Sequence, residues 1–240
     1  QQLGQQILAA WDQWDGDLEL PERACHGDLK VSNIRMDTEG RYARCLIDLD
    51  TLGMMPLAVE MGDAWRSWCN PTMEDDWRNT RFCVQTFEAT ATAWLQQAPD
   101  LDSEELHSLV PGIERICLEL SARFCADAVQ NTYFSEDRAR FPDVGEHNLI
   151  RARSQFTLAQ SARSQRRACE EVIQKAVHSI SRARYGTPCP SLSPSALLAN
   201  TSRASASRRR YCAGSWPQPC LRVVMTATCT LNTAHPHPSH

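Results

Sequence analysis

The sequence predicts an α+β fold that is mainly helical and contains one small β-hairpin. Most of the chain up to residue 184 repeats apolar side chains every three or four positions, which is typical of amphipathic helices. The stretch 35–48, "RMDTEGRYARCLID", instead places two short runs on either side of Glu39-Gly40, the pattern of a hairpin. Hydrophobic residues make up 42% of the 240 and charged residues 22%, which is normal for a globular protein.

Helical spacing is clearest in three stretches besides the one that follows Asp102. The first covers residues 2–14, the second covers 73–97, and the last covers 148–184. We expect each stretch to form one helix, with the hairpin lying between the first and the second.

A capping box predicts the start of a further helix. Asp102 is followed three positions later by Glu105, so each side chain is expected to accept a hydrogen bond from the backbone of the other. The apolar spacing then continues to Ala128. Pro111 and Gly112 fall in the first half, and we expect them to kink this helix or to delay its start.

The composition changes after residue 184. Residues 185–240 contain no acidic residue and are rich in Ser, Pro, Thr and Arg, which predicts a disordered tail and suggests out-of-frame translation. We therefore divide the chain into a folded unit, 1–184, and a tail, 185–240. The basic run 208–210 and the histidine-rich end 235–240 are weak signals for nucleic acid and for metal, respectively.

Several classes of protein are disfavoured by composition. A net charge of −4 gives no case for binding nucleic acid or a membrane surface. The sequence has no apolar run long enough to span a bilayer, and its N-terminal residues lack the pattern of a signal peptide. None of the eleven cysteines forms a C-x-x-C pair, so we expect reduced, packed thiols in a cytoplasmic protein rather than a zinc site.

The stretch "CHGDLKVSNIRMD", residues 25–37, carries the chemistry. Phosphoryl transfer needs a carboxylate to orient the attacking hydroxyl, together with carboxylate and amide oxygens that hold Mg²⁺ against the phosphates. Asp28, Asn33 five positions later, and Asp48 after the predicted strand supply these groups in order. The alternative is a set of exposed turn acids, with Asn33 as a helix cap.

The motifs H-G-D-x-x-x-x-N and I-D-x-D resemble those of the aminoglycoside phosphotransferase and choline kinase superfamily, which has a protein-kinase-like fold. The segments "CLIDLDT", "MGDAWR" and "EHNLIRARSQFTLAQ" are most similar to its N-acetylhexosamine 1-kinase branch. The resemblance covers roughly residues 1–167 and is strongest over 24–70. It implies a kinase that transfers phosphate from ATP, with Mg²⁺, to a hydroxyl of a small molecule such as a sugar or aminosugar.

The resemblance also implies roles for individual residues. Asp28 is the implied catalytic base, His26 a support for its loop, and Lys30 a cation near the transferred phosphate. Asn33 and Asp48 are the implied Mg²⁺ ligands.

The remaining candidates are assigned less specifically. Asp50 is expected to contact metal or sugar, and Asp63 to brace the catalytic loop by hydrogen bonding. Arg66 is expected either to steady that acid or to approach substrate. We expect Glu60 at the surface or behind the site. Three tryptophans offer a platform for stacking a sugar, although packing is their more common role: Trp65, Trp68 and Trp77.

In this superfamily ATP binds between two lobes, and the lobe that holds the nucleotide precedes the catalytic loop. Only 25 residues precede His26 here, so the resemblance implies a C-terminal lobe without its N-terminal partner. The ATP site is then incomplete, and we expect little or no ATP-dependent turnover by this chain alone. The alternative is an inactive remnant of the fold that acts at most as a binding module. Exposure of the surface that faces the other lobe would favour self-association.

Overall fold

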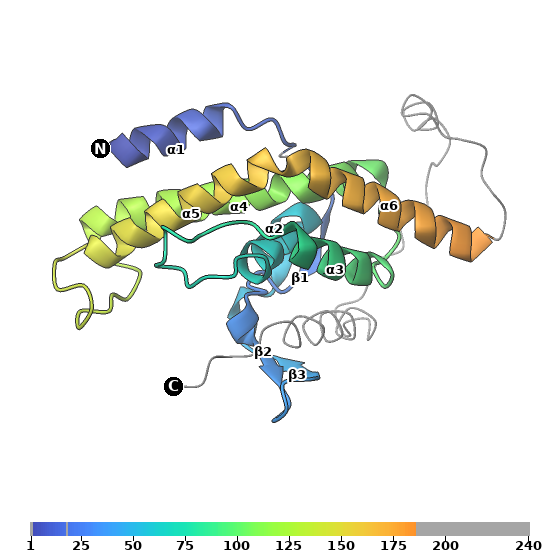
Figure 1. Cartoon of the computed structure of the whole chain (residues 1–240), viewed down its shortest axis with the longest axis horizontal. Coiled ribbons are helices and arrows are strands. Elements are labelled where there is room, and N and C mark those ends of the chain that lie inside the picture. Colours follow the sequence, from blue (N-terminus) through green and yellow to red (C-terminus); the bar gives the residue numbers. More distant parts are fainter. Residues whose placement is uncertain (1, 18, 186–240) are drawn as a thin grey trace.

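The computed structural model of the chain describes residues 2–17 and 19–185. The predictions for the tail, including the basic run and the histidine-rich end, lie outside these residues. Figure 1 shows long helices that cross the whole described part, with short strands gathered below them. The prediction of a mainly helical α+β fold is confirmed at this level.

Helices account for most of the described residues (Figure 1). None of those in the described stretch combines the length and the apolar character needed to cross a bilayer. The helices are α1 Gln2–Asp12, α2 Leu57–Trp68, α3 Val84–Leu95, α4 Ser103–Gln130, α5 Glu146–Ser164 and α6 Arg166–Tyr185.

The described strands form two antiparallel pairs. The predicted hairpin is confirmed, since β2, Ile34–Met36, pairs with β3, Ala43–Leu46. A second pair joins β1, Glu22–Cys25, to β4, Gly53–Pro56. This second pair was not predicted, because about thirty residues separate its partners and neither strand alternates clearly. It closes a loop whose two ends carry the candidate catalytic and metal-binding residues.

Two helix boundaries were predicted wrongly. The second helix begins at Val84 rather than at residue 73, because the preceding residues form a loop that packs against α5. The last predicted helix is two helices that break at Gln165, whose side-chain amide donates to the carbonyl of Phe82 at 2.9 Å. Apolar spacing continues through both places, so the sequence pattern alone does not reveal the breaks.

The predicted capping box is present at the start of α4. The amide of Glu105 donates to the Asp102 carboxylate at 2.8 Å, and the amide of Asp102 donates back to Glu105 at 3.1 Å. The helix starts at Ser103, immediately after this cap, so the expected delay is wrong. Pro111 lies inside the helix, and its carbonyl accepts a hydrogen bond from the indole of Trp14 at 3.1 Å.

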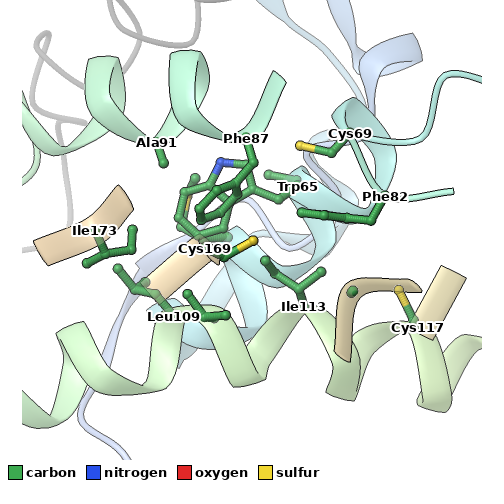
Figure 2. Close-up of a cluster of buried hydrophobic side chains, with 14 of the residues drawn as sticks. Trp65, Cys69, Phe82, Phe87, Ala91, Leu109, Ile113, Cys117, Cys169 and Ile173 are labelled. Carbon is green, nitrogen blue, oxygen red and sulfur yellow. The ribbon is translucent and has the colours of Figure 1, made fainter. Parts of the chain in front are cut away.

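An aromatic cluster fixes the position of α2 in the core (Figure 2). Trp65 is fully buried, with its ring centroid 4.9 Å from that of Phe87 and 5.9 Å from that of Trp94 on α3. Figure 2 shows side chains of α4 and α6 around these rings, including Leu109 and Ile173. Burying an aromatic side chain of this size removes about 150–250 Å² from water, so α2 is strongly anchored.

Helices α2 and α4 lie in close backbone contact at two glycines. A Cβ at Gly112 would lie 2.2 Å from the carbonyl oxygen of Ala58, and one at Gly62 would lie 2.5 Å from the carbonyl oxygen of Gly112. Contacts this short with backbone atoms cannot be relieved by turning a side chain. Glycine is therefore required for α2 to lie directly on α4.

We predict that Gly112→Ala destabilises the fold by about 1–3 kcal/mol, because the added methyl group forces the two helices apart. Gly4→Ala in α1 is the matched control, since its Cβ would meet only the Cys125 sulfur at 3.9 Å. That control is expected to leave stability unchanged or raise it by up to about 1 kcal/mol. Urea unfolding measures both, and equal stabilities for the two variants would contradict the close contact.

Candidate active site

The candidate catalytic loop runs from the end of β1 to the start of β2. His26 follows β1 directly, and Asn33 closes a single turn of 3₁₀ helix, Val31–Asn33, that leads into β2. The candidate metal loop follows β3 and contains a second 3₁₀ turn, Leu49–Thr51. The two antiparallel pairs thus bring together two segments that lie about twenty residues apart.

Asp28 is held by one of its two carboxylate oxygens. Its Oδ2 accepts a hydrogen bond from Lys30 Nζ at 2.5 Å and another from Asn33 Nδ2 at 2.8 Å. Asn33 Nδ2 also donates to the backbone carbonyl of Asp28 at 2.9 Å. Oδ1 has no hydrogen-bond partner among the described residues. This oxygen is the one free to accept a proton from a hydroxyl group.

Lys30 lies among three carboxylates. Its ammonium is 2.5 Å from Asp28 and 3.9 Å from Asp48, and the charge of Asp63 also acts on it. Burial lowers the pKa of Lys30, but the hydrogen bond with Asp28 and the three negative charges outweigh burial and raise it. The side chain therefore stays positively charged.

His26 connects the catalytic loop to the metal loop. Its ring is 1% exposed, its Nε2 lies 3.0 Å from the carbonyl oxygen of Ile47, and its Nδ1 accepts from the amide of Asp28. A carbonyl only accepts, so the geometry places the ring proton on Nε2. Ile47 also donates its own amide to the carbonyl of Asn33 at 3.0 Å. These two bonds join Ile47 to both ends of the catalytic loop, and they therefore fix the backbone just before Asp48.

Gly27 takes the place that Arg holds in the H-R-D motif of protein kinases. Its φ is +83°, in the region that side chains rarely adopt, and a Cβ there would lie 2.6 Å from the carbonyl oxygen of Thr51. The hydroxyl of Thr51 donates to the carbonyl of His26 at 2.7 Å. Glycine thus allows the metal loop to pack against the backbone of the catalytic loop.

Glu60 makes the contacts that the sequence led us to expect of Asp63. Its Oε1 accepts from the amide of His26 at 3.0 Å, and its Oε2 accepts from the amide of Gly27 at 2.7 Å. Burial raises the pKa of Glu60, although these two hydrogen bonds act in the opposite direction. Glu60 is only 4% exposed, so the surface alternative is wrong and it lies behind the loop. Its position one turn before Asp63 was the available clue.

Asp63 instead binds Arg66 on the same helix. Its Oδ1 accepts from Arg66 Nε at 3.1 Å and from Nη2 at 2.7 Å, while Oδ2 is buried without a hydrogen-bond partner. Arg66 is 8% exposed, and its other nitrogen lies 3.6 Å from Glu74. Of the two roles expected for Arg66, these contacts match that of steadying the acid.

The candidate metal ligands supply oxygen donors, as Mg²⁺ requires. Asp48 has φ +68°, a conformation that costs a non-glycine residue roughly 1–2 kcal/mol. Strain of this kind concentrates at functional sites. Asn33 uses its amide nitrogen on Asp28, which leaves its Oδ1 for a metal. Asp50 is exposed in the turn after Asp48. Mg²⁺ is usually held by one or two carboxylates together with phosphates and waters, so this donor set fits it.

The part of the chain that the structure describes shows no cluster of metal-binding side chains, and two of the three tryptophans have defined surroundings. Within the described residues, no group of three or more His, Cys, Asp or Glu side chains is placed to hold a metal ion, at the candidate site or elsewhere. Trp65 lies wholly in the core, so it offers no stacking surface. Trp77 lies near two guanidinium groups, those of Arg78 and Arg153.

Comparison with known families agrees with the motifs. Residues 1–104 match the model of the phosphotransferase enzyme family. The matched segment contains the catalytic loop, the metal loop, α2 and α3. The match supports the phosphotransferase superfamily that the motifs indicate, and it suggests activity of the kinase type.

We predict that Glu60→Gln speeds hydrogen exchange at the amides of His26 and Gly27. A carboxamide offers one acceptor oxygen where the carboxylate offers two, and an unsatisfied buried amide costs about 1–3 kcal/mol. Asp63→Asn is the matched control and should leave exchange at both amides unchanged. If Asp63→Asn, and not Glu60→Gln, exposes these amides, then Asp63 is the brace and the assignment to Glu60 is wrong.

Proposed function

We propose that this chain carries the catalytic and metal-binding part of an ATP-dependent small-molecule kinase. The observation that carries the proposal is the arrangement of Asp28. One of its oxygens is fixed by Lys30 and Asn33, the other is free, and the carboxylate of Asp48 lies beside the same ammonium. This arrangement falls inside the segment that matches the phosphotransferase family.

The residues take distinct roles in the proposed reaction. Asp28 orients the acceptor hydroxyl and receives its proton on the free oxygen, a contribution worth about 10²–10⁴-fold for a general base. Lys30 neutralises charge that develops on the phosphoryl group, which is a large part of catalysis in such sites. Asn33 and Asp48 would hold Mg²⁺, with Asp50 adding negative charge nearby. The metal, when bound, neutralises the phosphates and orients the group to be transferred.

We propose a sugar or aminosugar as the acceptor, with the anomeric hydroxyl as the site of phosphorylation. Support comes from the segments "CLIDLDT" and "MGDAWR", which resemble the N-acetylhexosamine 1-kinase branch. In the structure these segments are the metal loop and the turns of α2 that carry Asp63 and Arg66. Arg66 is engaged by Asp63 and Glu74, so substrate contact is assigned to Asp50 before Arg66.

We predict transfer of phosphate from ATP to N-acetylglucosamine or N-acetylgalactosamine that depends on Asp28. The assay uses excess protein, millimolar ATP and long incubation, so that slow transfer by the 240-residue chain is detected by ³¹P NMR of the product. Asp28→Asn should lower the rate by about 10²–10⁴-fold, because the proton acceptor is lost.

Asp37→Asn is the matched control for that assay. Asp37 is an acid of the hairpin turn whose carboxylate accepts from the amides of Arg41 and Tyr42, away from the catalytic groups. Transfer that persists in Asp28→Asn overturns the proposed role of Asp28. Transfer that is absent with all sugar and amino alcohol acceptors tried overturns the proposal that this chain is active by itself. The second outcome favours the inactive binding module.

We also predict a Mn²⁺ site, with Mn²⁺ as the probe for Mg²⁺. Electron paramagnetic resonance counts free Mn²⁺ and so measures binding without turnover. Asp48→Asn should weaken binding at least about tenfold, because a neutral amide replaces the main charged ligand. Asp37→Asn should bind as the unchanged chain does. Equal affinity in Asp48→Asn would remove Asp48 from the ligand set.

A further inference from the structure

The last turn of α2 holds the backbone on both sides of Lys30. The amide of Val31 donates to the Ser67 hydroxyl at 3.0 Å. The indole Nε1 of Trp68 donates to the carbonyl of Leu29 at 2.8 Å. These bonds link two adjacent residues of the helix to the two loop residues that flank Lys30.

The same helix holds the other end of the loop through Glu60. Glu60 and Ser67 are seven residues apart, which is two helical turns, so both lie on one face and are separated by about 10 Å. That face therefore contacts the loop backbone at His26 and Gly27 and again at Leu29 and Val31.

Lys30 needs such support because its side chain is long. A lysine side chain loses about 2 kcal/mol of rotamer entropy when it is fixed. Its ammonium contacts Asp28 at 2.5 Å while the side chain remains 40% exposed. Packing alone does not fix it, so the position of its backbone decides whether the ammonium reaches Asp28 and Asp48.

Trp68 has a second tie that keeps it in place. It is half-buried and packs against both the main core and the small cluster that Ile34 and Ala43 form within the hairpin. Because its N–H donates to Leu29 and its ring packs against both clusters, this side chain is poorly placed to stack on a sugar.

We propose that Ser67 and Trp68 are positioning residues that place Lys30 against Asp28 and the metal loop. This rests on the proposed function for the role of Lys30 in catalysis, although the placement itself is testable without turnover. Ser67 and Trp68 act on the backbone of the loop and not on substrate. Loss of either bond should let the 3₁₀ turn shift and the ammonium leave Asp28.

The lysine content of the chain allows a direct test. The chain has two lysines, Lys30 and Lys175, and Lys175 is exposed on α6. With lysine labelled by ¹³C at Cε, the NMR spectrum reports Lys30 with Lys175 as an internal reference. Added Mn²⁺ should broaden the Lys30 signal and leave that of Lys175 sharp.

Ser67→Ala and Trp68→Phe each remove one hydrogen bond and keep most of the packing. In both we expect the Lys30 signal to move toward that of Lys175. We also expect its broadening by Mn²⁺ to fall, because losing one hydrogen bond lowers the equilibrium constant for holding Lys30 against Asp28 by about 2- to 10-fold. Ser67→Thr retains a hydroxyl and should keep the Lys30 signal at its original position. Trp77→Phe is the control for replacing a tryptophan that does not bond to the loop.

Kinetics separate positioning from general destabilisation. In the Lys30→Met background, Ser67→Ala should lower kcat no further, because the group that it positions is already absent. Additive losses in the double variant, or an unchanged Lys30 signal in both folded single variants, would overturn the proposal. If no Mn²⁺ binds and no transfer occurs, the proposed function fails, and the position of the Lys30 signal still decides the placement.

Discussion

The candidate site depends on one helix that satisfies the backbone of a loop. Buried amides and carbonyls must find partners, and a catalytic loop that leaves regular structure has few of its own. The buried carboxylate of Glu60 accepts hydrogen bonds from two backbone amides of the loop. At the end of α2, the Ser67 hydroxyl accepts a further one and the Trp68 indole donates one. The surface of α2 therefore satisfies backbone groups of the loop that the loop's own hydrogen bonds leave unpaired.

The rigidity of α2 explains why such a loop keeps its shape. Trp65 anchors the helix in the aromatic cluster, and the contact between Gly62 and Gly112 sets it directly on α4. The face that binds the loop and the face that packs in the core belong to the same two turns. A shift in the core is thus transmitted to the catalytic loop without an intermediate element.

The carboxylates around Lys30 concentrate negative charge, which favours a cation at the site. Asp28, Asp48 and Asp63 all act on its ammonium, and Asp48 and Asp50 add negative charge on the exposed side. An ammonium between two carboxylates marks a place where positive charge is stabilised. In the proposed site Asp48 would hold Mg²⁺, which would supply positive charge beside the same carboxylates.

Short sequence motifs were enough to predict several local structures of this protein. The motif from His26 to Asn33, the hairpin and the capping box at Asp102 are local patterns, and the structure contains the hairpin and the cap as predicted. What the sequence could not decide depends on residues far apart in the chain. The break at Gln165 and the pairing of β1 with β4 arise from tertiary contacts that no local pattern encodes.

The bracing acid is the clearest case of this division. The sequence determined that acids follow the metal loop on a helix, and the resemblance pointed to Asp63. Only the tertiary structure decided that Glu60 meets the loop while Asp63 turns to Arg66, because the rotation of α2 is fixed by its packing on α3 and α4. Sequence specifies which groups are present. Their directions follow from the buried contacts that orient the helix.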